Sequence, residues 1–417
     1  MKYHAYTSRT LRTIPQLAAL PAERIEEMRV VASVLPFKVN SYVTGELIDW
    51  DRWQTDRMFE LTFPRRGMLS PEHYDRVLGS GLDPQVIRRV RLELNPQSSD
   101  QLANAPDGLS GIQHKYAHTL LFFPAQGQTC HAYCSYCFRW PQFVGMDEMK
   151  FASKQADELV GYLRAHPYVT DVLFTGGDPM IMRASVLERY VRPILDAPDL
   201  GHVTIRIGSK ALSYWPYRFL TDPDAGELLG LFREIAASRL LAFQAHLTLP
   251  VELRPPVVAE AIAAVRATGA VIRTQAPIIG HINDDVDIWV RMLQKEVRLG
   301  LVPYYMFVER DTGARHHFEI PLERALEVYH GVVSSLSGLA HTLRGPVMSA
   351  SAGKVMLEDI VTIGRERFFV LRNLQMRDAS RNGAVRFARY DPAARWYDDL
   401  EFVDPARPEM QPIMLER

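Results

Sequence analysis

The chain has 417 residues and a formal net charge of −1, from 48 basic and 49 acidic residues. This balance argues against nucleic acid or an anionic membrane as a partner, because both require an excess of positive charge. Hydrophobic residues make up 47% of the chain, yet no run approaches the roughly 18 apolar residues of a membrane span, so we expect a globular protein. No apolar secretory segment follows Met1, and we expect a cytoplasmic protein.

The first region, residues 1–110, is predicted to be mainly helical. Pro21 is followed by acidic residues, a pattern typical of the first turn of a helix. A second helical pattern lies near residues 81–93. From about residue 118 the pattern changes to short β-branched or aromatic runs, which alternate with longer amphipathic segments.

Six strands and six helices are predicted in alternation. The strands are Thr119–Phe123, Val169–Phe174, His202–Ile207, Leu240–Leu247, Val271–Ala276 and Pro303–Val308. The helices lie near residues 150–165, 183–196, 224–238, 255–268, 286–299 and 322–337. Because the strand spacing of about 30 residues is the size of a βα unit, we expect an α/β fold with a partial (β/α)6 TIM-like barrel over residues 111–350. Residues 351–417 are predicted as a mixed C-terminal extension that is irregular from Asp391 onward.

All three cysteines of the chain, Cys130, Cys134 and Cys137, lie in one short loop after the first predicted strand. A disulfide would leave one of the three thiols unpaired, and a chain of this length buries a large core without the help of disulfides. Zinc needs a fourth ligand, for which only His131 is near, and three buried thiols without a metal are a further alternative. Three thiolates can also hold three irons of a [4Fe–4S] cluster and leave the fourth iron open to a ligand.

Polar or glycine-rich residues follow the other predicted strands, where ligands bind in parallel α/β folds. Gly176 and Gly177 allow the backbone to approach a ligand, although a plain turn in which Asp178 caps the next helix is the alternative. Arg139 could clamp a carboxylate beside the cysteines, or it could be a surface arginine or the partner of a local acid. Asp284 could bind a substrate cation or cap a helix.

Lys354 lies between small residues in the segment SAGKV, which predicts a tight loop. A lysine in such a loop can form a Schiff base with pyridoxal phosphate (PLP), although most lysines are simply solvated.

The Cys-x3-Cys-x2-Cys spacing, with Tyr136 before the third cysteine, resembles the signature of the radical S-adenosylmethionine (SAM) enzymes. The wider chain, from Leu35 to Arg372, resembles the lysine 2,3-aminomutase family of those enzymes. The segments that carry this resemblance are LPFKVNSYVTGELID, DPQVIRRVRLELNP, CHAYCSYCFRWPQFVG, FTGGDPM, TIRIGSK, IIGHIND, PYYMF and SAGKV.

The resemblance implies a radical SAM barrel and an isomerase that moves an α-amino group to the β-carbon. A 5'-deoxyadenosyl radical, made from SAM by the cluster, would act on a PLP aldimine of the amino acid. By this resemblance the cluster ligands are Cys130, Cys134 and Cys137, and the residues around SAM are Tyr136, Gly176, Gly177 and Asp178. Arg139 would bind the substrate carboxylate, Lys354 would bind PLP, and Asp284 would bind a lysine ammonium.

Departures from the family pattern concern substrate and PLP. The second aspartate that would bind a lysine ammonium falls at Arg310, which favours an acidic or neutral side chain, so lysine is in doubt as substrate. The arginine for the PLP phosphate falls near Thr119. A PLP-independent radical SAM enzyme and an iron–sulfur sensor are therefore alternatives. Expected partners are a small amino acid and an electron donor such as flavodoxin or ferredoxin, and whether the chain forms a homo-oligomer stays open.

Overall fold

A computed structural model describes residues 1–96, 104–146 and 149–403 of the chain. The first region is mainly helical, with α1 (Ala22–Val34), α2 (Arg57–Thr62), α3 (Pro71–Gly79) and α4 (Pro84–Glu93). Both predicted helices are present: α1 begins directly after Pro21, and α4 begins after Asp83, whose side chain accepts hydrogen bonds from two backbone amides of its first turn. Residues 97–103, which the helical prediction included, lie outside the described residues.

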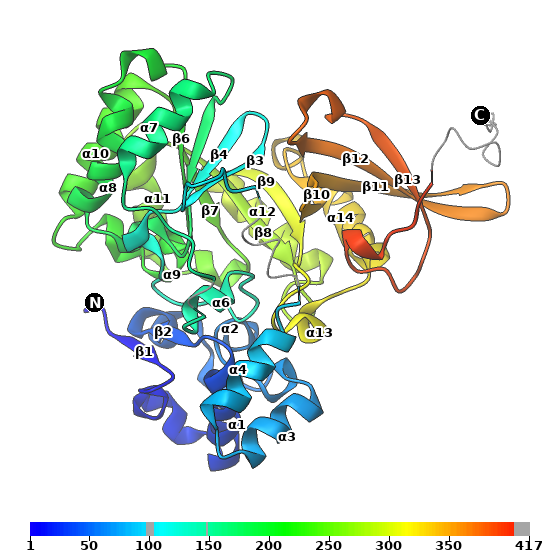
Figure 1. The fold of residues 1–417 in the computed structure, drawn as a ribbon. Helices are drawn as coiled ribbons and strands as arrows, with labels where there is room; N and C mark the ends of the chain where they lie inside the picture. Colours follow the sequence, from blue (N-terminus) through cyan, green and yellow to red (C-terminus); the bar gives the residue numbers. More distant parts are fainter. Residues whose placement is uncertain (97–103, 147–148, 404–417) are drawn as a thin grey trace.

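This first region also holds a feature that the sequence patterns did not predict. Strands β1 (Ala5–Thr7) and β2 (Lys38–Asn40) form a separate two-stranded antiparallel sheet. The region packs below the rest of the chain in Figure 1.

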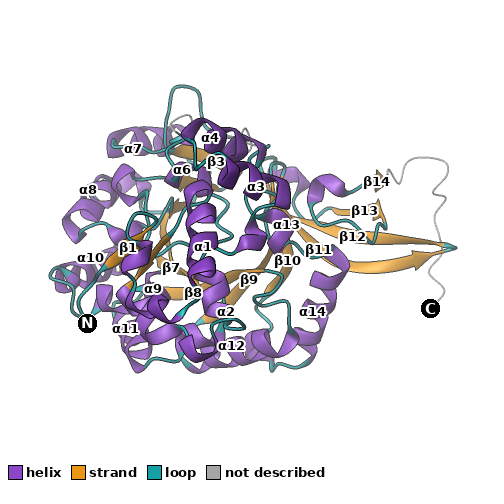
Figure 2. Ribbon diagram, turned by 90° about the horizontal axis from the view of Figure 1, so that it is seen from below, coloured by secondary structure: helices purple, strands orange, loops and turns teal. Residues whose placement is uncertain are grey.

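Six parallel strands form the centre of the molecule, and every predicted strand is among them. They are β4 (Thr119–Phe122), β5 (Asp171–Phe174), β6 (Thr204–Ser209), β7 (Leu241–His246), β8 (Val271–Ile278) and β9 (Val302–Val308). The predicted helices are also present, as α7 (Ala156–Ala165), α8 (Ala184–Leu195), α10 (Ala225–Ser238), α11 (Pro256–Arg266), α12 (Val286–Arg298) and α14 (Leu322–Ser334). Several of these helices form an arc around the strands in Figure 2.

The described strands of this sheet do not close on themselves. Its order places β3 (Ile112–Tyr116) at one edge and β14 (Phe402–Val403) at the other, with β4 to β9 in sequence order between them. The α/β class is therefore confirmed, while the barrel-like curvature of the six strands stays a prediction.

The C-terminal strands continue the same sheet, in which the pairing changes from parallel to antiparallel. Strand β10 (Arg344–Ala350) pairs parallel to β9, and β11 (Gly353–Ile363), β12 (Glu366–Met376) and β13 (Val385–Arg389) follow in antiparallel pairs. These strands bury their own apolar cluster beneath α14, and they project from the body in Figure 1. In the segment predicted as irregular from Asp391, β14 forms a short strand, and residues 404–417 lie outside the described residues.

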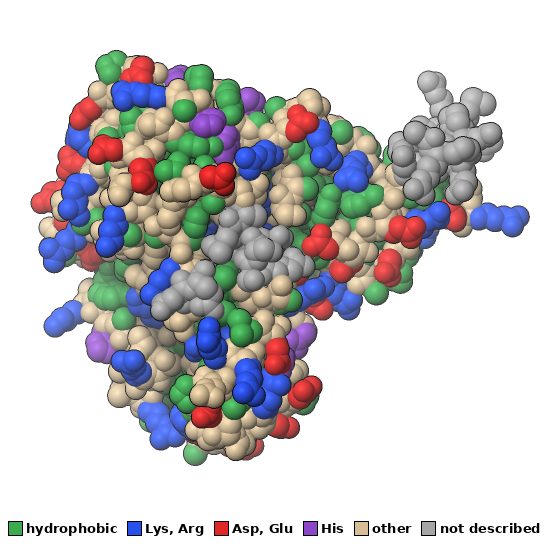
Figure 3. Space-filling view, viewed as in Figure 1, with side chains coloured by type: hydrophobic (Ala, Val, Ile, Leu, Met, Phe, Trp, Pro, Cys, Tyr) green, Lys and Arg blue, Asp and Glu red, His purple; other side chains and the backbone are tan. Residues whose placement is uncertain are grey.

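The surface agrees with the balanced composition. Acidic and basic side chains are interspersed over the face drawn in Figure 3. No helix within the described ranges is both long and apolar enough to cross a membrane.

Candidate active site

A cavity of about 260 Å³ lies along the inner face of the parallel strands. Some strands give alternate residues to its wall, such as Gln244 and His246 of β7, because side chains at every second position of a strand share one face. Four of the residues singled out from the sequence line this cavity, namely Tyr136, Arg139, Arg310 and Lys354.

The cysteine loop follows β4 and rests on the N-terminal helical region. Backbone amides of the loop donate to that region, from Tyr133 to the Lys38 carbonyl at 2.8 Å and from Ser135 to the Leu61 carbonyl at 2.9 Å. The Ser135 hydroxyl donates to the Glu60 carbonyl at 3.1 Å. Ser135 lies between two of the cysteines, so the N-terminal region helps to set where the thiols lie.

The three thiols are half-buried, and none forms a disulfide. Burial raises the pKa of Cys130 and Cys134 and raises the pKa of Cys137 to about 12, and the neighbouring thiols oppose each other's ionisation at Cys130 and Cys137. Three thiolates at this place therefore require a cationic partner, such as a metal centre.

Three thiols on one short loop are the donor set that a [4Fe–4S] cluster uses. Among the described residues, no three His, Cys, Asp or Glu side chains converge as ligands of one metal. A cubane instead takes one thiolate at each of three separate irons. His131, the fourth ligand of the zinc alternative, is buried, and its pKa is lowered to about 3 because burial disfavours the charged ring.

The two glycines after β5 lie tightly against the start of the cysteine loop. A Cβ on Gly177 would lie 2.4 Å from the Thr129 backbone nitrogen, and Gly176 has a φ of +135°. The Asp178 carboxylate accepts hydrogen bonds from the amides of Met180 (2.9 Å) and Lys210 (3.0 Å), and burial raises its pKa to about 6. Asp178 therefore has the role of a helix cap, as in the alternative of a plain turn. Contacts between a ligand and the backbone of Gly176 and Gly177 stay a prediction.

Arg139 is a buried cation with no acidic partner in the described part of the chain. Only 6% of the residue is exposed, and its guanidinium lies 4.1 Å from the centre of the Phe123 ring and 5.0 Å from that of Phe138. Its Nη1 atom has no hydrogen-bond partner, and burial lowers its pKa to about 10. The surface alternative for Arg139 is thus wrong, and the side chain is free to bind an anion that enters the cavity.

Lys354 is buried rather than solvated, and it lies in strand β11 rather than in the predicted loop, because the turn ends one residue before Gly353. Its ammonium donates to Gln375 Oε1 at 2.9 Å and lies 4.8 Å and 4.6 Å from the ring centres of Tyr116 and Tyr305. Burial, and next the charge of Arg206, lower the pKa of Lys354 to about 7. A large share of this amine is neutral, and so nucleophilic, near neutral pH.

Arg310 lines the cavity but is held by its neighbours. It donates to the Ser349 carbonyl at 2.7 Å, and its guanidinium lies 5.2 Å from the centre of the Trp396 ring. The adjacent Glu309 is buried, its Oε2 atom has no partner, and burial raises its pKa well above the ordinary value. The cavity thus meets the Arg310 guanidinium, held by hydrogen bond and ring contact, and the buried Glu309 carboxyl where β9 ends.

Asp284 is not among the residues that line the cavity. Its neighbour Asp285 caps α12 instead, accepting from the Ile288 amide at 3.1 Å, and the Asp284 carbonyl accepts from Arg324 at 2.9 Å. The alternative in which Asp284 caps the helix is therefore wrong by one residue, and no contact among the described residues directs Asp284 toward a ligand, so its role in binding a cation stays a prediction.

Sequence patterns missed several polar residues of the wall. Arg206, Gln244 and Gln275 lie inside central parallel strands, and Lys115 comes from β3. Central parallel strands are usually apolar on both faces, so the alternation of polar and apolar residues in TIRIGS was a usable signal. Arg206 forms an ion pair with Asp171, and Thr119 donates to the same carboxylate at 3.0 Å.

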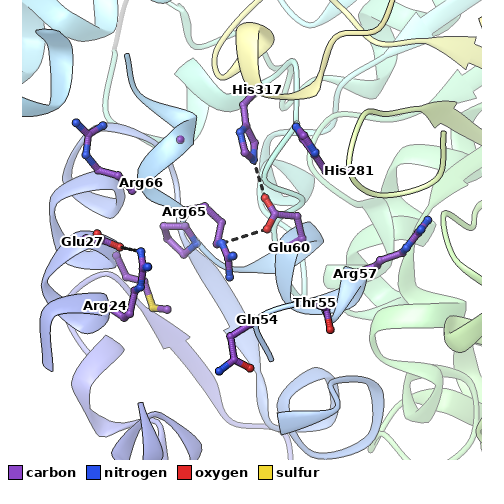
Figure 4. A pocket seen from close by; sticks show the side chains of 13 residues that line it. Arg24, Glu27, Gln54, Thr55, Arg57, Glu60, Arg65, Arg66, His281 and His317 are labelled. Atoms are coloured by element: carbon purple, nitrogen blue, oxygen red, sulfur yellow. Dashed lines mark hydrogen bonds and ion pairs between the residues drawn. The ribbon is translucent and has the colours of Figure 1, made fainter. Parts of the chain in front are cut away.

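A second hollow of about 380 Å³ lies between the N-terminal helices and the loops after β8 and β9 (Figure 4). Its charged side chains largely pair with each other. Glu60 binds both His317, at 2.6 Å, and Arg65, at 3.1 Å, while Arg24 pairs with Glu27 at 2.7 Å. The Glu60–His317 contact connects the N-terminal region to the core, while the other two pairs lie within the N-terminal region.

Comparisons with known proteins give relatives over most of the chain, although no family model matches. The chain is 30% identical over 381 residues to a protein of Aquifex aeolicus named "Putative L-lysine 2,3-aminomutase", covering 91% of both chains. It is 25% identical over 354 residues to the L-lysine 2,3-aminomutase of Bacillus subtilis, covering 85% of this chain and 67% of that protein.

Similarity to solved structures is weaker. A radical SAM methyltransferase from Sphaerobacter thermophilus is 15% identical with a TM-score of 0.37, and the match covers 63% of this chain and 89% of the other. The structure of TYW1 with a lysine-pyruvate adduct bound is 11% identical with a TM-score of 0.29, covering 70% and 93%.

Proposed function

The chain belongs to the lysine 2,3-aminomutase family of radical SAM enzymes, and we propose that it moves the α-amino group of an amino acid to the β-carbon. The observation that carries this proposal is Arg139, a buried guanidinium with no acidic partner among the residues that the structure describes, in one cavity with the amine of Lys354. An amino acid brings the carboxylate that such an arginine binds.

The residues present fit the cofactors of this reaction. A [4Fe–4S] cluster on Cys130, Cys134 and Cys137 would supply the electron that cleaves SAM, and PLP on Lys354 would supply an electron sink for the migrating nitrogen. An external donor of the flavodoxin or ferredoxin type would provide that electron. Lys115 in the same wall carries positive charge of the kind that a phosphate needs, while the charge of Arg206 is matched by Asp171.

The remaining residues orient the substrate and keep water out. Arg139 holds the carboxylate from a fixed position, because it lies between Phe123 and Phe138. The rings of Tyr116 and Tyr305 cover the Lys354 amine and shield it from water. A shielded site also protects a carbon radical from side reactions.

We propose that the substrate side chain is acidic or neutral rather than cationic. The side chains of Lys115, Arg139, Arg206, Arg310 and Lys354 line the cavity as bases, and the only acid among the described lining residues is Glu309. Burial raises the pKa of Glu309, and this weakens the one acid of the wall as a partner for the charge of a lysine side chain.

The test is anaerobic reconstitution with iron, sulfide, SAM and PLP, followed by mass spectrometry for β-amino products from a panel of amino acids. We expect a β-amino product from an acidic or neutral amino acid, and a large loss of turnover in Arg139→Lys with the iron content unchanged. Conversion of lysine alone would contradict the substrate class. SAM cleavage that needs no PLP would favour the PLP-independent alternative.

A further inference from the structure

One cysteine thiol lies beside a buried tyrosine hydroxyl. The Tyr214 Oη atom lies 3.5 Å from Cys134 Sγ, and only 1% of Tyr214 is exposed. Tyr214 is the last residue of the short helix α9 (Ala211–Tyr214), which follows β6. Within the described residues, this sulfur is the only hydrogen-bond partner of the hydroxyl.

The backbone of Tyr214 is tied to the cysteine loop. The buried Asn40 side chain donates to the Tyr214 carbonyl at 2.9 Å and to the His131 carbonyl at 3.2 Å. One amide therefore connects the helix end to the loop that holds Cys134. The backbone of Tyr214 and the cysteine loop are therefore held at a set distance from each other.

The ring of Tyr214 is fixed by a buried ion pair. The Lys210 ammonium lies 4.5 Å from the ring centre and donates to Glu252 at 2.7 Å and Thr248 at 3.1 Å. Thr248 lies 3.1 Å from the Tyr136 hydroxyl. The charged end of Lys210, held by this network, thus packs over the Tyr214 ring beside Cys134.

The direction of the hydrogen bond follows from chemistry. A thiolate that binds iron carries no proton, so it can only accept. A phenol ordinarily loses its proton only at about pH 10, so at neutral pH the Tyr214 hydroxyl is protonated and donates. Hydrogen bonds to the sulfur ligands are among the properties that set the potential of an iron–sulfur cluster.

We propose that Tyr214 raises the reduction potential of the cluster by donating a hydrogen bond to Cys134. The inference rests on the proposed function, because it requires the cluster. The cluster takes up one electron from an external donor; no bond of the protein breaks, and the Tyr214 proton stays on its oxygen. The reduced cluster carries one more negative charge, so the hydrogen bond is stronger in that state and favours reduction.

The experiment compares Tyr214→Phe with Tyr133→Phe. Tyr133 is a matched control from the cysteine loop itself, because its hydroxyl pairs with Thr129 at 3.0 Å and not with a thiol. Each variant is reconstituted without air, iron and sulfide are counted, and the reduced cluster is titrated by electron paramagnetic resonance against potential.

We expect equal iron in all three proteins and a more negative midpoint in Tyr214→Phe only. At a fixed potential in the lower part of the titration, the ratio of reduced to oxidised cluster should fall about three- to tenfold, the size of one hydrogen bond. Replacing Tyr214 by a fluorotyrosine, a stronger donor of the same shape, should shift the midpoint the other way.

An unchanged midpoint in both Tyr214 variants, or an equal shift in Tyr133→Phe, would overturn the inference. If Tyr214→Phe fails to fold, the fluorotyrosine variant decides alone, since its shape is that of the native residue. Wild-type protein that binds no cluster under these conditions would overturn the proposed function itself, and is distinguished by its iron content.

Discussion

Arg139→Met should stabilise the free protein and disable it as an enzyme. The pKa of Arg139 falls from 12.5 to about 10 through burial, and this fall corresponds to about 3 kcal/mol of folding free energy lost while the group stays charged. Because the pKa is lower in the folded state, the loss is complete at all pH values below about 10. Contacts with the two phenylalanine rings offset about 1 kcal/mol of it.

The net expectation for Arg139→Met is a free energy of unfolding about 1–3 kcal/mol higher than wild type, since methionine fills the space without a charge. The assay is denaturant unfolding of the cluster-free protein at pH 7. The matched control is Arg206→Met, in the same cavity wall, where the arginine is paired with Asp171. Removing that partner leaves a carboxylate behind, so the control should lose about 3 kcal/mol.

Activity should move in the opposite direction. The loss of a bidentate contact to the substrate carboxylate should lower kcat/KM of Arg139→Met about a hundredfold. If Arg139→Met were destabilised as much as Arg206→Met, or kept wild-type kcat/KM, the reasoning from an unpaired buried guanidinium would be refuted.

Three further outcomes are expected. Borohydride should trap PLP covalently on Lys354, and the yield, read by mass spectrometry, should rise with pH through about 7, since the neutral amine reacts. Lys354→Ala should abolish this trapping. A yield that rises only near pH 10 would refute the lowered pKa of Lys354. Gly177→Ala should lower stability and iron content, because its Cβ would lie 2.4 Å from the Thr129 nitrogen. Gly161→Ala should lower neither, because a Cβ there would have no neighbour within 4 Å. Equal losses in the two variants would contradict the close approach at Gly177. Cys137→Ala should lose most iron and all SAM cleavage, and retained cleavage would count against the cluster.

Much of the fold was predictable because its signals are local. Each of the six strands, and the helix after it, has a short repeating pattern of apolar residues. A pattern that spans about ten residues can be recognised without knowing which other elements pack against it. The small β1–β2 sheet was missed because strands of three residues carry almost no pattern. The loop predicted around Lys354 became a strand because pairing with β10 and β12 outweighs the preference of its small residues for a turn.

The sequence by itself determined the cysteine loop, the order of strands and helices, and the residue types available for chemistry, since each depends on neighbours along the chain. Only the tertiary structure decided which of them meet. Arg139 and Lys354 share a cavity while Asp284 does not. Arg139 lies in the loop after β4 and Lys354 in β11, and which loops and strands meet over one face of the sheet depends on contacts between residues far apart in the chain. Likewise, nothing near Cys134 in the sequence marks Tyr214, which reaches it only because strand β6 carries α9 to the cysteine loop.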